Sequence, residues 1–433
     1  MKIEKTPVSL AKLTGFFLYT QKKLFGIVFP PMKDKEIQKL ITAEQKRQKS
    51  VVNLIASENY VSKDVLIALG TELTNKYAEG YSGARYYGGN AVVDSIEDLC
   101  KKRALDLFKL SPKKWAVNVQ ALSGSPANLA VFLALVPQGG TIMGMNLQDG
   151  GHLTHGHKAS ATGKIWKQIP FGVDLKTEQI DYDALKELAL TEKPHLIIAG
   201  FTAYPRKVDF KKFRAIADAC GALLLVDMSH LAGLIAGGVY PSPFPYADVV
   251  TTTTHKTLRG PRSALIFSKI DSREFPKKID KAVFPGLQGG PHVNAISAVA
   301  VALKEASTPA FKTYSAQVLK NATALSNELK TLGYRIISGG TDSHMILVDT
   351  WMNGAGISGG EASDRLEKVG IIVNKNTIPG ETRSPMDPSG IRIGTAGETT
   401  RGKKEKDMIA IAKRIDQTLR KTSTKTSGKT PRN

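Results

Sequence analysis

An alternation of short apolar runs with helical patterns is the feature of this chain that most constrains its fold. The apolar runs are short and continuous, which is typical of strands that are buried on both faces of a sheet. They lie at residues 197–199, 223–226 and 264–267. The helical patterns lie at residues 95–108, 127–136 and 210–220. This alternation predicts an α/β fold in which helices cover a mostly parallel sheet.

The pattern changes after about residue 310. Helix-like segments at 311–332 and 360–369 flank short apolar runs at 345–348 and 391–393. We expect a smaller α+β domain here. No G-x-G-x-x-G sequence follows any predicted strand, which weakens the interpretation of the chain as a dinucleotide-dependent dehydrogenase.

The composition is that of a soluble globular protein, with 42% hydrophobic and 23% charged residues in 433 positions. This length allows about two or three domains. The two cysteines, Cys100 and Cys220, have no paired spacing. Their number and spacing speak against a disulfide framework or a cysteine zinc site, and they indicate a reducing cytoplasm.

The formal net charge of +21 is concentrated partly at the two ends. Residues 1–31 carry five Lys and one Glu, and residues 420–433 carry five basic residues and no acid. The remaining excess is spread over the body, where it favours anionic ligands. No zinc-finger or aromatic-basic motif accompanies it, so the sequence does not favour nucleic-acid binding.

The first 31 residues differ from the rest of the chain. Their apolar runs at 13–19 and 24–29 are separated by Gln-Lys-Lys, and neither is long enough to span a bilayer, which needs about 20 apolar residues. The segment ends in two prolines. We interpret it either as a basic appendage or as lying upstream of a biological start at Met32, and we expect no membrane span.

Lys256 and Asp227 stand where two predicted strands end. Lys256 follows four threonines and His255, and Asp227 closes the run 223–226, with His230 three residues on. A lysine can hold pyridoxal phosphate as a Schiff base, and an aspartate can keep its pyridine nitrogen protonated. An exposed lysine and a turn-capping aspartate are the plain alternatives. Because ligands gather at the carboxyl ends of strands in open α/β sheets, we favour the cofactor site.

Two further segments suit the same cofactor and an amino-acid substrate. Ser123, Gly124 and Ser125 precede the helix-like run from 127, and a helix N-terminus with hydroxyl groups binds phosphate. Alone, this segment would be read as a simple helix cap. Arg392 lies between apolar strand residues, and its guanidinium suits a substrate carboxylate, the alternative being a structural ion pair.

Three histidines lie close together in the sequence, and a separate segment is rich in Gly and Tyr. His152, His155 and His157 have no H-E-x-x-H spacing, and glycines interrupt any helix there, so we predict no metal site. We favour His152 as a flat ring against the cofactor, with His155 and His157 in a structural turn. The segment 77–89 carries many tyrosines and glycines, which indicates ligand contact or an interface.

Taken together, these segments resemble the serine hydroxymethyltransferase family. The resemblance runs in order through residues 35–415. The matching segments are 53–59, 73–81, 85–89, 144–147, 150–156, 226–230, 251–260, 284–291, 373–376 and 390–394. The run Thr-Thr-Thr-His-Lys, which ends at Lys256, is the most specific of them.

The resemblance implies roles for individual residues. The implied catalytic residues are Lys256, Glu79, His230, Asp227 and Thr253. The implied pyridoxal phosphate contacts are Ser123, Gly124, Ser125, His152, Thr202, Asp227, His230, His255 and Lys256, with Tyr77 and Gly290 from a partner subunit. The implied substrate contacts are Ser57, Glu79, Tyr87 and Arg392. The implied folate contacts are Leu147, Gly151, Leu153 and Asn376.

The resemblance also implies the fold and the reaction. The fold is that of the aspartate-aminotransferase-like pyridoxal phosphate enzymes, with a mostly parallel seven-stranded sheet and a smaller C-terminal α+β domain. We expect an N-terminal arm at 32–75, a large domain at 76–310, a small domain at 311–419 and a disordered basic tail at 420–433. The reaction is transfer of the serine hydroxymethyl carbon to tetrahydrofolate, giving glycine and 5,10-methylenetetrahydrofolate, in a cytoplasmic homodimer or tetramer with shared active sites.

The chain departs from the family's usual sequence at a few positions. Ala121 and Leu122 stand where the family often has other residues, and Pro205 and Arg206 follow Thr202, Ala and Tyr. None of these departures removes an implied catalytic group. Two alternatives stay open: a related pyridoxal phosphate enzyme such as a threonine aldolase or an α-methylserine-type transferase, and a basic RNA-binding protein on an inactive enzyme scaffold.

Overall fold

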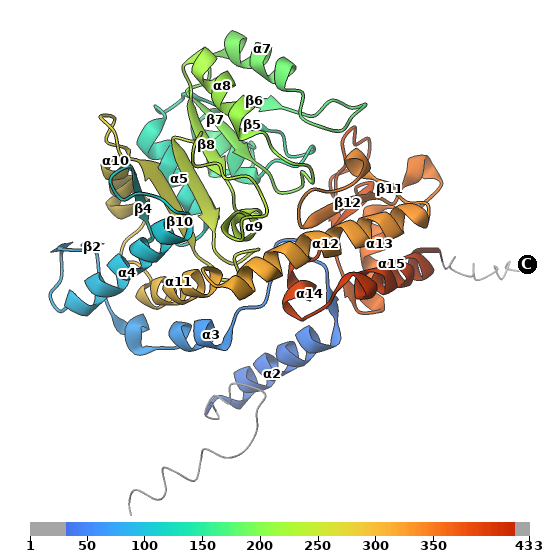
Figure 1. Cartoon of the computed structure of the whole chain (residues 1–433), viewed down its shortest axis with the longest axis horizontal. Helices are drawn as coiled ribbons and strands as arrows, with labels where there is room; N and C mark the ends of the chain where they lie inside the picture. The colour runs from blue at the N-terminus through green and yellow to red at the C-terminus, as the bar shows by residue number, and fades with distance from the viewer. Residues whose placement is uncertain (1–31, 421–433) are drawn as a thin grey trace, which may run out of the picture. The chain divides into compact units, whose positions relative to one another are not determined.

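A seven-stranded sheet organises the larger part of the molecule (Figure 1). The computed structural model describes residues 32–420. The strand order is β4 (Trp115–Asn118), β10 (Ala264–Lys269), β9 (Val249–Thr253), β8 (Leu223–Asp227), β7 (Leu196–Gly200), β5 (Thr141–Met145) and β6 (Lys167–Phe171). Strands β6, β5, β7, β8 and β9 are parallel, whereas β10 pairs antiparallel with both β9 and β4. The predicted α/β fold with a mostly parallel seven-stranded sheet is confirmed.

Helices cover both faces of this sheet, which explains why its strands are continuously apolar. One face packs against α5 (Gly124–Leu135) and α10 (Phe275–Lys281). The other face packs against α4 (Ala91–Leu107), α7 (Tyr182–Glu192), α8 (Phe210–Cys220), α9 (Ala232–Ala236), α11 (Val293–Ala306) and the start of α12 (Pro309–Thr331). Neighbouring residues of β7 point to opposite faces: Leu196 and Ile198 contact the first group, and Ile197 and Ala199 the second.

A second sheet, of four antiparallel strands, lies towards the C-terminus (Figure 1). Its order is β11 (Arg335–Ile336), β12 (Met345–Asp349), β15 (Gly390–Gly394) and β14 (Asn374–Asn376). It shares an apolar core with α12, α13 (Gly359–Lys368) and α15 (Glu405–Arg420). A short parallel pair, β1 (Val52–Asn53) with β13 (Ile371–Ile372), joins the segment before residue 57 to this part.

The remaining elements are short. The β2–β3 hairpin consists of Gly80–Tyr81 and Ala84–Arg85. The short α-helices are α3 (Lys63–Leu69), α6 (Ala161–Ile165) and α14 (Ala396–Thr400). Single helical turns lie at Glu72–Asn75, Leu153–His155, Ala282–Leu287, Ile337–Gly339 and Met352–Gly354. Of the described residues, none belongs to a helix long and apolar enough to cross a membrane.

Among the described residues, 32–49 belong to a unit separate from Ser50 onwards. Its described element is α2 (Lys35–Ser50), which buries none of its residues and exposes Ile37, Leu40 and Ile41. The expected appendage at 1–31 and residues 421–433 of the expected tail at 420–433 lie outside the described residues, whereas Arg420 is the last residue of α15 and not part of a disordered segment. The domain boundaries at 75 and 310 stay predictions. The second of these falls just after the start of α12.

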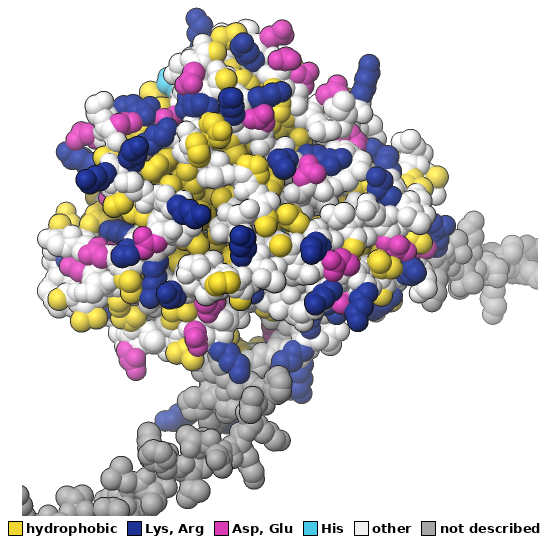
Figure 2. Space-filling model, viewed as in Figure 1, with side chains coloured by type: hydrophobic (Ala, Val, Ile, Leu, Met, Phe, Trp, Pro, Cys, Tyr) yellow, Lys and Arg dark blue, Asp and Glu magenta, His cyan; other side chains and the backbone are white. Residues whose placement is uncertain are grey.

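On the face shown in Figure 2, the basic residues of the body are distributed and form no cluster. Figure 2 shows Lys and Arg side chains scattered over the visible face, among acidic and apolar ones. On that face the excess of positive charge therefore forms no single patch of the kind that binds nucleic acid.

Candidate active site

Lys256 lies just beyond the end of β9, at the carboxyl edge of the large sheet. Its Nζ donates a hydrogen bond to Thr253 Oγ1 at 3.1 Å. Burial lowers the pKa of Lys256 to about 8, and the nearby Arg392 and Arg262 act in the same direction against the charge of Asp227. The neutral, nucleophilic fraction of this amine near neutral pH is therefore larger than that of an ordinary lysine.

Asp227 ends the neighbouring strand β8 and is held by four hydrogen bonds. Its Oδ1 accepts from Ser229 N at 3.1 Å and Ser229 Oγ at 2.6 Å, and its Oδ2 accepts from Asn128 Nδ2 at 3.0 Å and His155 Nε2 at 3.2 Å. Burial opposes ionisation, but the hydrogen bond and charge of His155 hold the pKa of Asp227 well below its ordinary range. The carboxylate is thus fixed in position and ionised.

Lys256 and Asp227 open into one cavity because β8 and β9 are parallel neighbours, with Asp227 opposite Thr251. Residues from five loops and strand ends line it. They are Gly124, Asn128, His152, His155, Phe201, Thr202, Asp227, Ser229, His230, Thr253 and Lys256. A cavity at the carboxyl ends of strands is the expected ligand site of such a sheet.

The N-terminus of α5 reaches this cavity at Gly124. Ser123 caps the helix without a side-chain hydrogen bond to its own first turn, and Ser125 is exposed. A Cβ at Gly124 would lie 2.7 Å from Thr253 Cγ2, so a side chain there would collide with the strand that leads to Lys256. The absence of a side chain lets free backbone N–H groups approach a ligand, which suits an anion.

The three clustered histidines have three different surroundings. His152 lines the cavity, and burial together with His155 lowers the pKa of His152 to about 4, so its ring is neutral. Its Nδ1 accepts from Thr154 N at 3.2 Å, which leaves the proton on Nε2. His155 contacts Asp227, and His157 Nδ1 accepts from Ala159 N at 3.2 Å. Within residues 32–420, no group of acidic, His or Cys side chains has the arrangement of a metal site.

Arg392 approaches the same region from β15. Its guanidinium donates to Thr202 O at 2.5 Å and to Asn374 Oδ1 at 3.1 Å. Burial lowers the pKa of Arg392 to about 10, so it stays charged at neutral pH. The hydroxyl of Thr202 is used within the loop, since it donates to the carbonyls of Gly150 at 3.2 Å and Gly151 at 2.9 Å.

Ser57 belongs to a segment that runs alongside β15. Gly394 N donates to Leu54 O at 2.7 Å, and the neighbouring Ala56 lies against Gly394. Gly394 is two residues from Arg392 on the same strand. The segment that carries Ser57 therefore lies beside the strand that carries the buried guanidinium.

Tyr77, Glu79, Tyr87 and Gly290 form a second group, and none of them lines the Lys256 cavity. Tyr77 and Tyr87 have exposed fractions of 53% and 49%, and their rings meet edge to face at 5.0 Å. Tyr77 OH donates to Glu79 Oε1 at 3.3 Å, and a Cβ at Gly290 would lie 3.6 Å from the Tyr77 ring. We call residues 77–90 the tyrosine loop.

The Arg85 side chain holds the backbone of the tyrosine loop in place. The guanidinium donates to the carbonyls of Ala78 at 2.9 Å and Gly80 at 2.7 Å, the two residues that flank Glu79. It also forms ion pairs with Asp94 at 2.8 Å and Glu97 at 2.7 Å on α4. Since Arg85 and Glu97 are almost fully buried, this contact defines where Glu79 stands.

The predicted folate residues lie on two neighbouring loops. Leu147 and Leu153 are exposed, whereas Gly151 is buried. Thr377 Oγ1 donates to Gln148 O at 3.0 Å, which joins the loop of Leu147 to the segment after Asn376. Two exposed apolar side chains, Leu147 and Leu153, thus precede and follow His152 in this segment.

His255 and the departures from the family sequence have clear surroundings. His255 is not among the residues that line the cavity; its Nδ1 is buried and has no hydrogen-bond partner among residues 32–420. Leu122 N donates to Gln288 Oε1 at 3.0 Å. Arg206 donates to Ser338 O at 2.6 Å and to Asp342 at 3.2 Å, and Asp342 N donates to Pro205 O. Pro205 and Arg206 therefore link the large sheet's loops to the C-terminal part.

Sequence reasoning missed three groups that hold Asp227. They are Asn128, His155 and Ser229, of which His155 was assigned only to a turn. Asn128 carries a usable signal, because it is a polar residue in an otherwise apolar helix. His155 and Ser229 carry no such signal, since their contacts depend on how loops fold back on β8.

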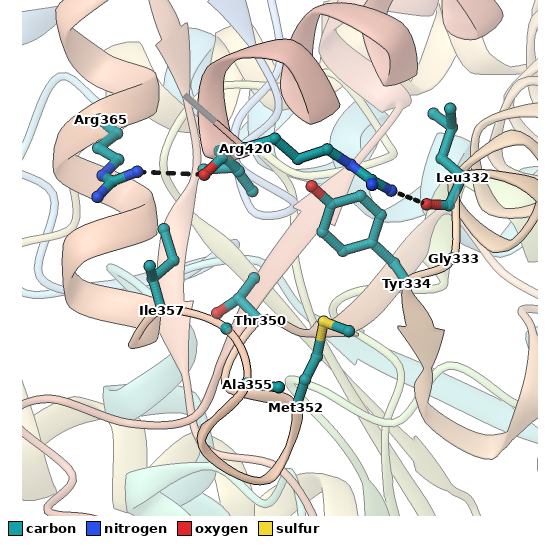
Figure 3. A pocket seen from close by; sticks show the side chains of 11 residues that line it. Leu332, Gly333, Tyr334, Thr350, Met352, Ala355, Ile357, Arg365 and Arg420 are labelled. Atoms are coloured by element: carbon teal, nitrogen blue, oxygen red, sulfur yellow. Dashed lines mark hydrogen bonds between the residues drawn. The ribbon is translucent and has the colours of Figure 1, made fainter. Parts of the chain in front are cut away.

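A separate cavity of about 490 Å³ lies in the C-terminal part (Figure 3). Leu332, Met352 and Ile357 give it an apolar lining, and Arg365 donates to Leu419 O at 3.1 Å beside it. Arg420 extends to Leu332 O. The lining contains none of the predicted site residues and no acid, cysteine or lysine, so it offers no comparable chemistry.

Comparisons with known proteins agree on one family. A family model described as serine hydroxymethyltransferase matches residues 31–415. The cytosolic serine hydroxymethyltransferase of Candida glabrata is 50% identical over 404 residues, which are 89% of this chain and 86% of the relative. The cytosolic enzyme of Saccharomyces cerevisiae is 50% identical over 403 residues, covering 89% and 85%. The serine hydroxymethyltransferase of Koribacter versatilis is 52% identical over 387 residues, covering 89% of each chain.

Proposed function

The chain belongs to the serine hydroxymethyltransferase family, and from this premise we propose how its residues carry out the reaction. It is an enzyme with serine hydroxymethyltransferase activity. We propose tetrahydrofolate as the acceptor, with glycine and 5,10-methylenetetrahydrofolate as products, and pyridoxal phosphate as the cofactor. Since three of its relatives carry the word cytosolic in their names, we also propose a cytoplasmic location.

The observation that carries the cofactor assignment is the pairing of Lys256 with an ionised Asp227 in one cavity. The amine of Lys256 is suited to hold an aldehyde covalently, and the four-fold hydrogen-bonded carboxylate of Asp227 is suited to a protonated pyridine nitrogen. The α5 N-terminus suits the phosphate, with Ser123, Gly124 and Ser125. When bound, pyridoxal phosphate supplies an electron sink for a breaking bond at the substrate Cα.

The neutral ring of His152 suits contact with the cofactor ring, and the charged guanidinium of Arg392 suits the substrate carboxylate. His152 offers a flat face in the cavity. Arg392 is suited to a substrate carboxylate, because a bidentate pair with a buried guanidinium orients the group it binds. We propose that the carboxylate replaces the present Thr202 carbonyl contact, with Ser57 and Tyr87 assisting.

Breaking the serine Cα–Cβ bond requires that the hydroxyl proton be taken up and later returned. We propose Glu79 for this proton transfer. Because Glu79 lies on the tyrosine loop and outside the Lys256 cavity, the Glu79 of one subunit serves the Lys256 of another, together with Tyr77, Tyr87 and Gly290. The exposed Ile37, Leu40 and Ile41 of α2 support a homodimer, since a subunit interface would cover them.

The folate-binding surface proposed here consists of the loops of Leu147, Gly151, Leu153 and Asn376. The exposed Leu147 and Leu153 offer apolar contact to a flat ring system, and Asn376 offers amide hydrogen bonds. These loops adjoin His152, so a bound pterin would lie next to the substrate hydroxymethyl group.

The deciding experiment measures glycine formation from serine by the purified protein loaded with pyridoxal phosphate, with and without tetrahydrofolate. We expect formation to depend on tetrahydrofolate and the loaded protein to be yellow. Folate-independent cleavage of threonine or serine as the main activity would favour a threonine aldolase. Absence of bound cofactor would favour the inactive-scaffold alternative.

A further inference from the structure

His344 is a fully buried histidine that lies behind the cavity and does not line it. It directly precedes β12, in the C-terminal part of the molecule. Its ring stacks on that of His230, with centroids 5.4 Å apart and planes inclined by 22°. Its Nε2 lies 3.2 Å from His230 Nδ1 and 3.1 Å from the carbonyl oxygen of Ala56.

With both contacts taken as hydrogen bonds, these two distances assign one tautomer to each ring. The carbonyl of Ala56 can only accept, so Nε2 of His344 must carry a hydrogen. His230 Nδ1 faces the same N–H at 3.2 Å and therefore has to be an acceptor without a hydrogen of its own. A neutral His230 then carries its proton on Nε2, the ring nitrogen left for the cavity that His230 lines.

Both rings are neutral in this arrangement. Burial, followed by the charges of Lys256 and Arg392, lowers the pKa of His230 well below its ordinary value. Burial and the same two cations lower the pKa of His344 to about 3, against the Ala56 hydrogen bond. Among residues 32–420, His344 Nδ1 has no hydrogen-bond partner, consistent with a ring whose single hydrogen is on Nε2.

We propose that His344 is a positioning residue, which fixes His230 in the Nε2–H form facing the cavity and holds the backbone of Ala56, next to Ser57. The positions of His230 and of the Ala56 backbone are independent of the proposed function. The inference rests on that function only for the purpose that these two groups have in the reaction. Under the proposed function, the Nε2–H of His230 would be available to donate to an acceptor oxygen of the cofactor, and the Ala56–Ser57 backbone would support the carboxylate site. One buried side chain thereby couples the cofactor side of the cavity to its substrate side.

The first test needs no cofactor. In the apoprotein, with ¹⁵N-labelled histidine, NMR of the imidazole nitrogens reports which nitrogen carries hydrogen. We expect His230 and His344 both as neutral Nε2–H forms, assigned by the loss of signals in single variants. In His344→Leu, His230 should lose its single form and show a mixture of the two. A wild-type His230 protonated on Nδ1 would overturn the proposal.

The second test uses the loaded enzyme with a graded set of variants. Loss of a buried hydrogen-bond donor suggests about a tenfold fall in kcat/KM for His344→Leu, with KM for serine raised because Ser57 is less well held. His344→Gln keeps an amide donor near the Nε2 position. Its kcat/KM and its KM for serine should therefore be close to those of wild type. Ser343→Ala is the control, because Ser343 is equally buried beside His344 and donates nothing to His230.

The outcomes separate the two proposals. Wild-type protein without folate-dependent glycine formation contradicts the proposed function, whatever the NMR result. An active wild type whose His344→Leu variant keeps both the His230 form and the KM for serine contradicts the role of His344. Equal losses in His344→Gln, His344→Leu and Ser343→Ala would reduce His344 to a packing residue.

Discussion

The Lys256 cavity and the tyrosine loop differ in how deeply their side chains are buried. In the cavity, Asp227 and Lys256 are buried, and their hydrogen bonds are made to groups of the same chain. On the tyrosine loop, Tyr77 and Tyr87 are half exposed, and their rings meet edge to face. Both regions carry residues of the kind that the chemistry requires, yet neither is a complete site.

The difference shows which part of the site a single chain can prepare alone. Groups whose ionisation must be set, such as the Lys256 amine and the Asp227 carboxylate, are placed where burial shifts their pKa values. Glu79 is instead partly buried on the tyrosine loop, outside the Lys256 cavity, and under the proposed function it serves the cavity of another subunit. The comparison predicts different behaviour for variants of the two regions.

The largest effect is expected for Lys256→Ala. Lys256 is the one amine among the described residues that line the cavity, so its removal should lower turnover on the order of a thousandfold or more. Steady-state glycine formation measures this, with Lys277→Ala as a control because Lys277 is an exposed lysine on α10. Full turnover in Lys256→Ala would show that the cavity is not the active site.

Mixed refolding of Glu79→Ala with Lys256→Ala tests whether the two regions meet across subunits. Each homodimer should be nearly inactive. In a mixed dimer one site carries both defects and the other carries none, so random pairing restores up to about a quarter of wild-type activity. Activity after joint unfolding and refolding measures this recovery.

The control for mixed refolding is each variant refolded alone, with mixed dimers demonstrated by differently tagged chains. If Glu79 and Lys256 met within one chain, every site in the mixture would retain a defect. Mixed dimers without recovered activity therefore exclude the shared site.

The buried charge of Lys256 should destabilise the apoprotein. With a folded-state pKa near 8 against an ordinary 10.5, the unfolded chain binds more protons between these values, so stability rises with pH across that window. The free energy of unfolding of Lys256→Met should then exceed that of wild type by about 3 kcal/mol at pH 7. This difference should shrink from pH 8 upwards. Urea unfolding at several pH values measures it; a gap independent of pH would mean that Lys256 is not charged and buried.

The smallest effect is expected for removal of residues 1–31. The family model matches residues 31–415, so a chain that starts at Met32 keeps all but the first residue of the match. A chain that starts at Met32 should keep kcat and KM within about twofold of the full chain, as expected of a change remote from the site. Loss of soluble protein would show instead that the segment is required by the rest.

The sequence predicts the central strands and several helices well because their apolar periodicity is strong. The expected helix at 210–220 coincides with α8, and the run 223–226 lies within β8. Strands β5 and β6 were missed, since Gly144 interrupts one and Pro170 the other. Pro170 is tolerated because β6 lies at the edge of the sheet.

Only those site residues that belong to a motif or follow the end of a strand could be predicted from the sequence. Lys256 and Asp227 follow recognisable apolar runs, so their proximity could be expected. The contact of Asp227 with Asn128, and that of His230 with His344, joins residues about a hundred positions apart, with no periodicity connecting them. Such contacts depend on the packing of whole elements, which local patterns do not encode.

The anchoring of the tyrosine loop has a consequence for assembly. Arg85 grips the carbonyls on both sides of Glu79 and is itself held by Asp94 and Glu97, all within one chain. A loop that already has its bound shape loses little conformational entropy when two surfaces associate. In the proposed homodimer we therefore expect subunits to dock as rigid bodies, at a rate governed by diffusion and orientation and not by loop ordering.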